Sequence, residues 1–285
     1  MLPVDVGWVE AKRSAGRDPT STACRELLGL AALDPTYFDR PRLTAGGRRK
    51  EKFSGKPMQQ LTIRIESKSG TTQRLLSVRE LVIAGWTGRD KEAVEKHIAE
   101  LEALGVNRPP HTPMFYRVSS ARLTTVAIIE VIGSSSTGEV EFILAGLDGE
   151  VLVGVGSDHT DRQLETVGIA VAKQICDKPV GATFWPLREV EGHWDQLLLR
   201  SRVTIDGTPH LYQGGSVAEL LSPADLVRRY ANADRLDDGV VMFGGTLAVH
   251  GGLRPAQRFE GELEDPVLKR RISFAYEIHT LPNGG

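Results

Sequence analysis

The sequence has little of what would mark several common classes of protein. Only two of its 285 residues are cysteines, Cys24 and Cys176, and they lie far apart without the spacing of metal ligands. A disulfide framework and a structural zinc site are therefore not expected, and a reducing compartment fits. The formal net charge is only −2, which argues against a surface built to hold nucleic acid or an anionic membrane.

Long hydrophobic runs are also missing. The longest, such as residues 27–33, are much shorter than the roughly 18 residues that a membrane span needs, and no signal-peptide pattern opens the chain. We therefore expect a cytoplasmic protein without membrane contact. No glycine motif has the strand-loop-helix setting that cradles phosphate. With 40% hydrophobic and 25% charged residues, the composition is globular, and small-molecule chemistry is the default function.

The composition changes at Met58. Residues 1–57 hold eleven Lys or Arg and seven Asp or Glu, and they are rich in Pro, Gly and Arg. A basic arm that binds nucleic acid is one interpretation. We favour a poorly ordered extension upstream of a start at Met58, followed by one catalytic domain over residues 58–285.

The part after Met58 has the pattern of a folded, mainly β domain of the α+β class. The alternation over residues 61–65 and the apolar run over residues 80–84 predict strands. Helical spacing of apolar residues over 91–104, closed by Gly105, predicts the clearest helix. From there to the C-terminus, short β-branched segments alternate with Gly, Asp and Ser, so few helices are expected.

One predicted hairpin brings acidic residues together. The segments 138–145 and 150–156 flank Asp148-Gly149, a dipeptide that favours a two-residue turn. In that register Glu139 faces Asp158 and Glu141 faces Gly156, and residues two apart on a strand share a face. Three carboxylates, from Glu139, Glu141 and Asp158, then converge at the open end of the hairpin.

Such a cluster needs a compensating positive charge, because like charges opposite one another destabilise a sheet. A hard divalent metal is the simplest answer, since ligation by oxygen alone suits Mg²⁺, Mn²⁺ or Ca²⁺. The alternative is an exposed hairpin whose acids are merely solvated.

Several segments, in the right order over roughly residues 80–280, resemble motifs of the fumarylacetoacetate hydrolase family. Glu139-Val140-Glu141 is similar to its Glu-x-Glu, residues 158–162 to its Asp-x-x-x-Arg, and Lys173 to its active-site lysine. The other matching segments are residues 97–100 (a His-x-x-Glu dyad), 113–117, 184–187, 239–246 and 253–257. The order of the segments carries the resemblance, because none of them is specific alone.

The sequence also departs from the family pattern. The usual Asn-Tyr before the histidine is missing, and residues 86–95 stand in its place. Arg117 replaces a lysine, Leu247 replaces the proline after Gly-Thr, and Glu165 stands where glutamine is frequent. The chain therefore resembles a divergent branch, and its substrate is expected to differ from those of named members.

The resemblance implies a rolled, mixed β-sheet with a few peripheral helices, and a homodimer. It implies a divalent cation, Mg²⁺ or else Mn²⁺ or Ca²⁺, held by the three acids. His97 becomes the candidate base, with Glu100 one helical turn on to fix its tautomer, and Lys173 a further catalytic residue. Arg117, Arg162 and Thr246 become candidates for substrate binding. His159 is a second candidate base, although its place beside Asp158 should turn it to the opposite face.

Family members act on 2-oxo acids or 1,3-dicarbonyl compounds through an enolate that the metal stabilises. We expect hydrolytic cleavage of a carbon–carbon bond in a small oxo acid. Two alternatives remain: a lyase, such as a sugar-acid dehydratase or an oxaloacetate-type decarboxylase, and a non-catalytic binding protein that kept the fold.

Overall fold

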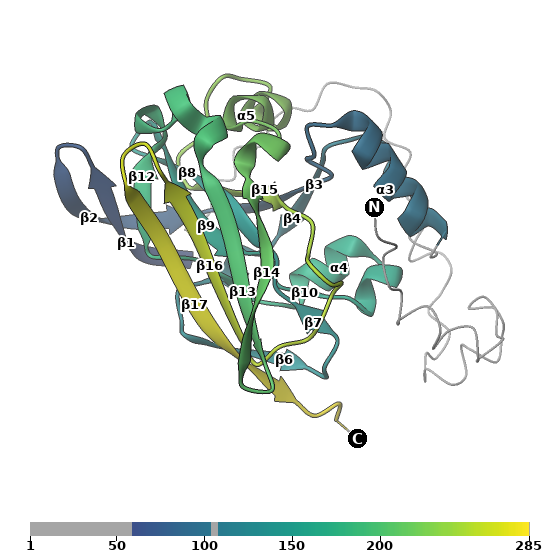
Figure 1. The fold of residues 1–285 in the computed structure, drawn as a ribbon. Helices are drawn as coiled ribbons and strands as arrows, with labels where there is room; N and C mark the ends of the chain where they lie inside the picture. Colours follow the sequence, from purple (N-terminus) through teal and green to yellow (C-terminus); the bar gives the residue numbers. More distant parts are fainter. Residues whose placement is uncertain (1–58, 104–107, 285) are drawn as a thin grey trace. The chain divides into compact units, whose positions relative to one another are not determined.

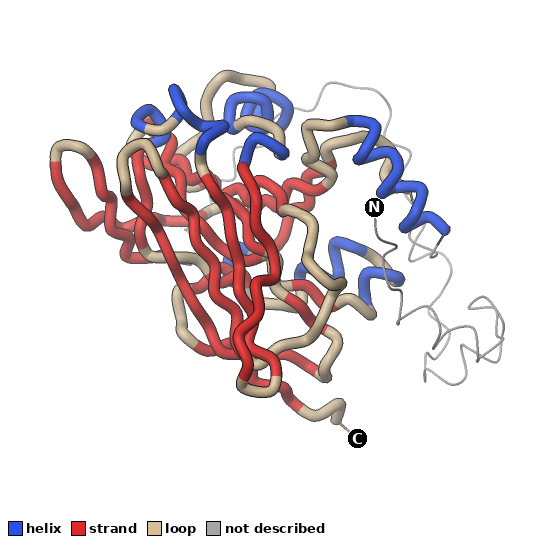
Figure 2. The backbone as a smooth tube through the Cα atoms, in the orientation of Figure 1, coloured by secondary structure: helices blue, strands red, loops and turns tan. Residues whose placement is uncertain are grey.

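The computed structural model describes residues 59–103 and 108–284. The extension predicted for residues 1–57 lies outside these residues. Strands take up far more of the described backbone than helices do (Figure 2), so the prediction of a mainly β fold is confirmed.

The larger of two main sheets has eight strands in the order β2-β1-β12-β9-β8-β15-β3-β4. It is mixed, because β1 pairs with β12 and β15 with β3 in parallel while the other neighbours are antiparallel. Its strands are β1 (Gln59–Ser67), β2 (Gly70–Val78), β3 (Glu80–Gly85), β4 (Met114–Val118), β8 (Val140–Leu147), β9 (Glu150–Ser157), β12 (Thr183–Pro186) and β15 (Val240–Thr246).

The second sheet has five strands in the order β14-β13-β16-β17-β6, four of which run side by side in Figure 1. Only β17 and β6 pair in parallel. These strands are β6 (Ile128–Ile132), β13 (Leu198–Ile205), β14 (Thr208–Ser216), β16 (Arg258–Asp265) and β17 (Arg270–Leu281).

Two short strand pairs and several helices complete the described fold. The pairs are β10 (Thr160–Asp161) with β7 (Ser136–Thr137), and β11 (Lys178–Pro179) with β5 (Leu123–Thr124). The α-helices are α3 (Lys91–Ala103), α4 (Ile169–Gln174) and α5 (Pro223–Ala231). The 3₁₀ turns are η2 (Ser120–Arg122), η3 (Leu164–Thr166), η4 (Leu187–Glu189), η5 (Glu191–Gln196) and η6 (Val217–Glu219). Within the described residues, no helix has the length and apolar character to cross a membrane.

The predicted helix is present as α3. Its start is stabilised by Asp90, whose carboxylate accepts hydrogen bonds from the backbone N–H groups of Glu92 and Ala93. Ile98 is the buried side chain on its inner face, while His97 and Glu100 lie on its exposed side. The helix therefore packs on the fold through a narrow face.

The core lies on both faces of strand β8. Phe142 packs between the sheets with Leu199 of β13 and Phe259 of β16, while Ile143 belongs to a second cluster with Leu61 of β1. A strand buried on both faces has a continuous apolar sequence rather than an alternating one. Glu141 interrupts this apolar strand, and a buried charge there calls for an explanation.

Candidate metal centre

The hairpin of β8 and β9 has the predicted register. Asp148 and Gly149 both have positive φ, as a type I′ turn requires, and Glu141 faces Gly156. Glu139 lies one residue before β8 and Asp158 one residue after β9, and the Asp158 N–H donates to the Glu139 carbonyl at 3.0 Å. The hairpin thus holds both residues at its open end.

The three acids form one cluster. Glu139, Glu141 and Asp158 each offer a carboxylate oxygen, and these oxygens lie within 4.8 Å of one another. Among the described residues this is the one group of three or more potential metal ligands. Asp158 is fully buried and Glu141 nearly so, whereas Glu139 is half-buried. The cluster therefore opens to solvent on the side of Glu139.

Glu141 carries the least compensated charge of the three. Burial raises the pKa of its carboxyl well above the ordinary value, and the nearby Asp158 raises it further. Its Oε2 accepts a hydrogen bond of 2.6 Å from the Gly245 N–H, but no described Lys or Arg forms an ion pair with it. Gly245 has φ of +99°, and a Cβ there would lie 1.7 Å from Thr87 Oγ1. Only glycine fits this position.

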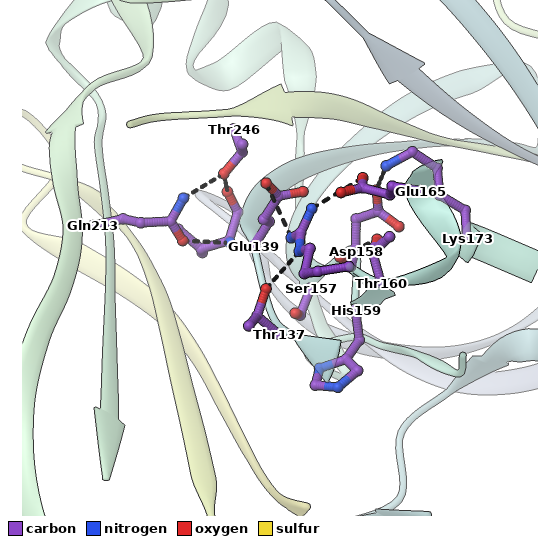
Figure 3. A network of polar contacts seen from close by, with 12 residues as sticks. Thr137, Glu139, Ser157, Asp158, His159, Thr160, Glu165, Lys173, Gln213 and Thr246 are labelled. Atoms are coloured by element: carbon purple, nitrogen blue, oxygen red, sulfur yellow. Dashed lines mark hydrogen bonds and ion pairs between the residues drawn. The ribbon is translucent and has the colours of Figure 1, made fainter. Parts of the chain in front are cut away.

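Asp158 has the opposite environment. Its Oδ2 accepts a hydrogen bond from Lys173 Nζ, and its Oδ1 lies 3.4 Å from Lys178 Nζ. Burial opposes the charge of Asp158, but the two ammonium groups hold its pKa below the ordinary value. Lys173 was predicted from the sequence to lie at this site and does so (Figure 3). Lys178 was not predicted.

Arg162 joins Glu139 to its surroundings. Its Nε donates to Thr137 Oγ1 at 2.7 Å, its Nη1 donates to Glu165 Oε1 at 3.1 Å, and its Nη2 lies 3.1 Å from Glu139 Oε1. All three nitrogens therefore face groups of the protein. This geometry orients Glu139, and the substrate binding expected for Arg162 stays a prediction.

Thr246 also has its side chain engaged. Its hydroxyl donates to the Val140 carbonyl at 2.7 Å and accepts from Gln213 Nε2 at 2.6 Å. Gln213 is fully buried on β14, and its Nε2 also donates to the Leu247 carbonyl. Its Oε1 accepts from the Val140 N–H at 2.9 Å and from the Ser201 hydroxyl.

These contacts form a clamp, made by the Gln213 and Thr246 side chains on both backbone groups of Val140. Because Val140 stands between Glu139 and Glu141, the clamp fixes the spacing of two of the acids. Sequence reasoning missed Gln213. A polar residue beside Leu211 and Tyr212 in a strand was the available signal.

Most of the described domain matches a known protein family. The family model described as "Protein of unknown function (DUF2848)" matches residues 84–276, which include the acids and the residues around them. The chain belongs to the DUF2848 family. A search among curated proteins finds no match.

Solved structures relate this DUF2848 chain to the fumarylacetoacetate hydrolase fold. Cg1458, solved with an inhibitor, is 18% identical with a TM-score of 0.53, over 73% of this chain and 81% of its own. The apo form of 2-keto-3-deoxy-D-arabinonate dehydratase is 14% identical with a TM-score of 0.52, over 74% and 77%. A protein from Yersinia pestis CO92, assigned to the fumarylacetoacetate hydrolase family, is 17% identical with a TM-score of 0.52, over 79% and 100%.

These identities establish the fold alone. The resemblance found in the motifs is thereby confirmed, and the rolled, mixed sheet with few helices is the architecture of these structures. The match to a separate family model agrees with the divergent branch expected from the sequence.

In this DUF2848 member the candidate base stands apart from the acids. His97 is 62% exposed on α3, with its Nδ1 3.8 Å from Glu100 Oε2. Its ring lies beside Trp86, at 5.8 Å between centroids, and Trp86 Nε1 donates to the Tyr116 hydroxyl at 3.3 Å. The structure thus brings His97 and Glu100 together, but among the described residues no hydrogen bond or ion pair joins His97 to Glu139, Glu141 or Asp158.

Tyr116 on β4 is the third ring of this aromatic group. Burial raises the pKa of its phenol, and the charges of Lys173 and Glu165 lie close enough to act on it as well. Its neighbour Arg117 is 53% exposed and pairs with Glu80 at 3.0 Å. Because adjacent strand residues point to opposite faces, Tyr116 and Arg117 lie on opposite faces of β4, and substrate binding by Arg117 stays a prediction.

His159 points away from the acids, as its place beside Asp158 predicted (Figure 3). It is fully buried, with Nδ1 2.9 Å from the Tyr276 hydroxyl and Nε2 2.9 Å from Ser136 Oγ. Burial lowers the pKa of its imidazole to about 3, so the ring is neutral at ordinary pH. Both ring nitrogens are engaged in the core, which leaves neither free for water or substrate.

The residues fit a divalent cation. The donors are oxygens alone, which hard cations prefer. Glu141 is buried without a cationic partner, and Asp158 Oδ1 is buried and accepts no hydrogen bond among the described residues. Both observations indicate negative charge for which the described side chains compensate only in part.

Proposed function

We propose that this protein is a divalent-metal-dependent enzyme that acts on a 2-oxo acid or a 1,3-dicarbonyl compound. The observation that carries the proposal is the cluster of Glu139, Glu141 and Asp158, whose oxygens lie within 4.8 Å of one another in a fumarylacetoacetate hydrolase fold. A cation held there, with Mg²⁺ first and Mn²⁺ or Ca²⁺ next, would act as a Lewis acid toward the substrate's oxygens.

The surroundings of the acids support an anionic substrate. Lys173 pairs with Asp158 and has 9% of its side chain exposed, so its ammonium lies beside the acids where an anionic substrate would bind. Tyr116 and Trp86 supply a phenol hydroxyl and an indole nearby. We assign Lys173 to stabilising negative charge on the substrate, and the two rings to the wall of its site.

Hydrolysis of a carbon–carbon bond is the reaction we favour, with His97 as the base that takes a proton from water and Glu100 as its orienting partner. The 3.8 Å between the two side chains supports the dyad. Apo enzymes often hold catalytic groups apart until substrate binds, so the exposed position of His97 is compatible with this role.

A lyase is the second candidate, and one observation favours it. Hydrolysis needs a water activated by a base, yet His97 makes no described contact with the acids. One structural neighbour is a dehydratase of a 2-keto-3-deoxy sugar acid. A dehydratase or a decarboxylase would need the same cation site without a water aimed at the substrate's carbonyl.

One screen tests both proposals. The wild-type protein, with Mg²⁺ or Mn²⁺, is incubated with acetylpyruvate, oxaloacetate and a 2-keto-3-deoxy sugar acid, and products are measured with and without EDTA. We expect turnover of one class that EDTA abolishes and that Glu141→Gln lacks. Loss of acetylpyruvate cleavage in His97→Asn supports hydrolysis, whereas retained turnover of another substrate in that variant supports the lyase. Turnover that survives EDTA would contradict the metal requirement.

A further inference from the structure

Four buried side chains form a series of hydrogen bonds on the side of Asp158 that faces away from the other acids. The hydroxyl of Tyr276, on β17, shares hydrogen bonds with Ser157 Oγ at 2.8 Å and with His159 Nδ1 at 2.9 Å. The other ring nitrogen of His159 lies 2.9 Å from Ser136 Oγ, on β7. None of the four residues has more than 4% of its surface exposed. We call these four residues the Tyr276 network.

The network holds the backbone on both sides of Asp158. Ser157 and His159 flank this acid, and residues two apart along an extended backbone point to the same face. Both side chains end at one hydroxyl of the second sheet, 119 and 117 positions further along the chain. The second sheet therefore fixes the backbone that directs the Asp158 carboxylate toward the other acids.

The network also reaches the segment that carries Glu139. Ser136 lies three residues before this acid, and Gly138 lies directly before it. A Cβ at Gly138 would be 2.6 Å from the Tyr276 hydroxyl, so the backbone here packs directly against the tyrosine. Glu139 and Asp158 are thus both carried by segments that contact one buried side chain.

We propose that the Tyr276 network makes the acid cluster rigid and thereby selects Mg²⁺ over Ca²⁺, with Tyr276 as its central positioning residue. This inference rests on the proposed function, because it needs a cation among the three acids. Mg²⁺ requires oxygens at about 2.0–2.1 Å in a nearly ideal octahedron, whereas Ca²⁺ accepts roughly six to eight oxygens at about 2.3–2.6 Å in flexible geometry. A fixed set of ligands favours the smaller ion, and a loosened set loses this preference.

The chemistry of the network suits a positioning role. The His159 ring is neutral, so it adds no charge beside the acids. A neutral imidazole has one donor nitrogen and one acceptor nitrogen, and a hydroxyl group at each side can serve either. Because every link is buried, displacing one of these side chains would leave polar atoms without partners. Outer partners of this kind tune metal binding although they do not touch the metal.

Tyr276→Phe tests the proposal, because it removes the shared hydroxyl and keeps the ring. Mn²⁺ affinity is measured by calorimetry, and the affinities for Mg²⁺ and Ca²⁺ by competition with Mn²⁺. We expect the Mg²⁺ affinity to fall about tenfold or more and the Ca²⁺ affinity to fall much less. The ratio of the two affinities should therefore decrease.

Two further variants separate positioning from a general loss of stability. Ile272→Val removes buried apolar atoms on the same strand, so it should lower the melting temperature but leave the ratio unchanged. Ser157→Ala removes the other end of one link. It should lower the ratio in the same direction, and it decides the matter if Tyr276→Phe does not fold. The double variant should have the ratio of Tyr276→Phe alone, because both changes break the same hydrogen bond.

The outcomes distinguish this inference from the proposed function. Equal losses of Mg²⁺ and Ca²⁺ affinity in Tyr276→Phe and Ser157→Ala, or no loss in either, would overturn the inference and leave the proposed function intact. A wild-type protein that binds metal but prefers Ca²⁺ to Mg²⁺ would do the same. A wild-type protein that binds none of the three ions would overturn both.

Discussion

Among the three acids, Glu141 is buried and has no described Lys or Arg as an ion-pair partner. Its replacement therefore tests metal binding separately from folding. Glu141→Gln keeps the shape and can still accept the Gly245 N–H, but it removes one of three anionic ligands. We expect Mn²⁺ affinity to fall about 100-fold or more. Isothermal titration on wild type and variant measures this. Equal affinities would remove Glu141 from the ligand set.

The raised pKa of Glu141 also predicts how the metal-free protein responds to pH. The folded state binds this proton more tightly than the unfolded state, where the ordinary value is 4.5. The stability contributed by Glu141 is therefore present below about pH 4.5 and is lost as pH rises toward the folded-state pKa. In EDTA, the melting temperature of Glu141→Gln should rise above that of the wild-type protein as pH increases. A constant difference between pH 4.5 and 8 would contradict the shift.

At the scale of elements, the turn of the β8–β9 hairpin lies far from the acids, so a substitution there should change stability without changing metal binding. Gly149 has φ of +78°, and a Cβ there would meet no atom within 4 Å, so Gly149→Ala adds only backbone strain. We expect a loss of about 1 kcal/mol, or about 2–4 °C in melting temperature. Mn²⁺ affinity should be unchanged, because the turn lies at the opposite end of the hairpin from the acids. A weakened affinity would mean that the turn sets the register at the site.

A substitution in the clamp on Val140 should lower both the stability and the metal affinity. Gln213→Leu leaves the buried Val140 N–H and the Leu247 carbonyl without partners, which should cost about 3 kcal/mol in the free energy of unfolding. Mn²⁺ affinity should fall about tenfold, because Glu139 and Glu141 flank the released backbone. Leu211→Ala, at an exposed position on the same strand, is the matched control and should change neither quantity. Unfolding in urea and metal titration give the two values.

For the whole molecule, we predict that a chain beginning at Met58 folds and binds metal as the full chain does. The reason is compositional, since residues 1–57 are rich in Pro, Gly and Arg and the first described strand follows directly. The melting temperatures of the two chains should agree within about 2 °C, and sedimentation should give a homodimer for both. A much lower melting temperature for the shorter chain would show that the extension contributes to the fold.

The features that the sequence determined by itself depend on residues close to one another along the chain. The hairpin register follows from a two-residue turn and a side-chain period of two, so the sequence alone is enough to bring Glu139, Glu141 and Asp158 together. Helix α3 follows in the same way from the spacing of apolar residues and from the glycine after it.

The tertiary structure decided which partners those residues have. Gln213 reaches Val140 across 73 positions of the chain, and Glu141 is held by a backbone N–H 104 positions away. Neither turn geometry nor periodicity carries information over such separations, because the packing of two sheets brings these groups together. Burial likewise determined which charged side chains need partners inside the protein. Lys178 reads as an ordinary surface lysine until the fold removes it from water, and only then does it need Asp158 and three carbonyls.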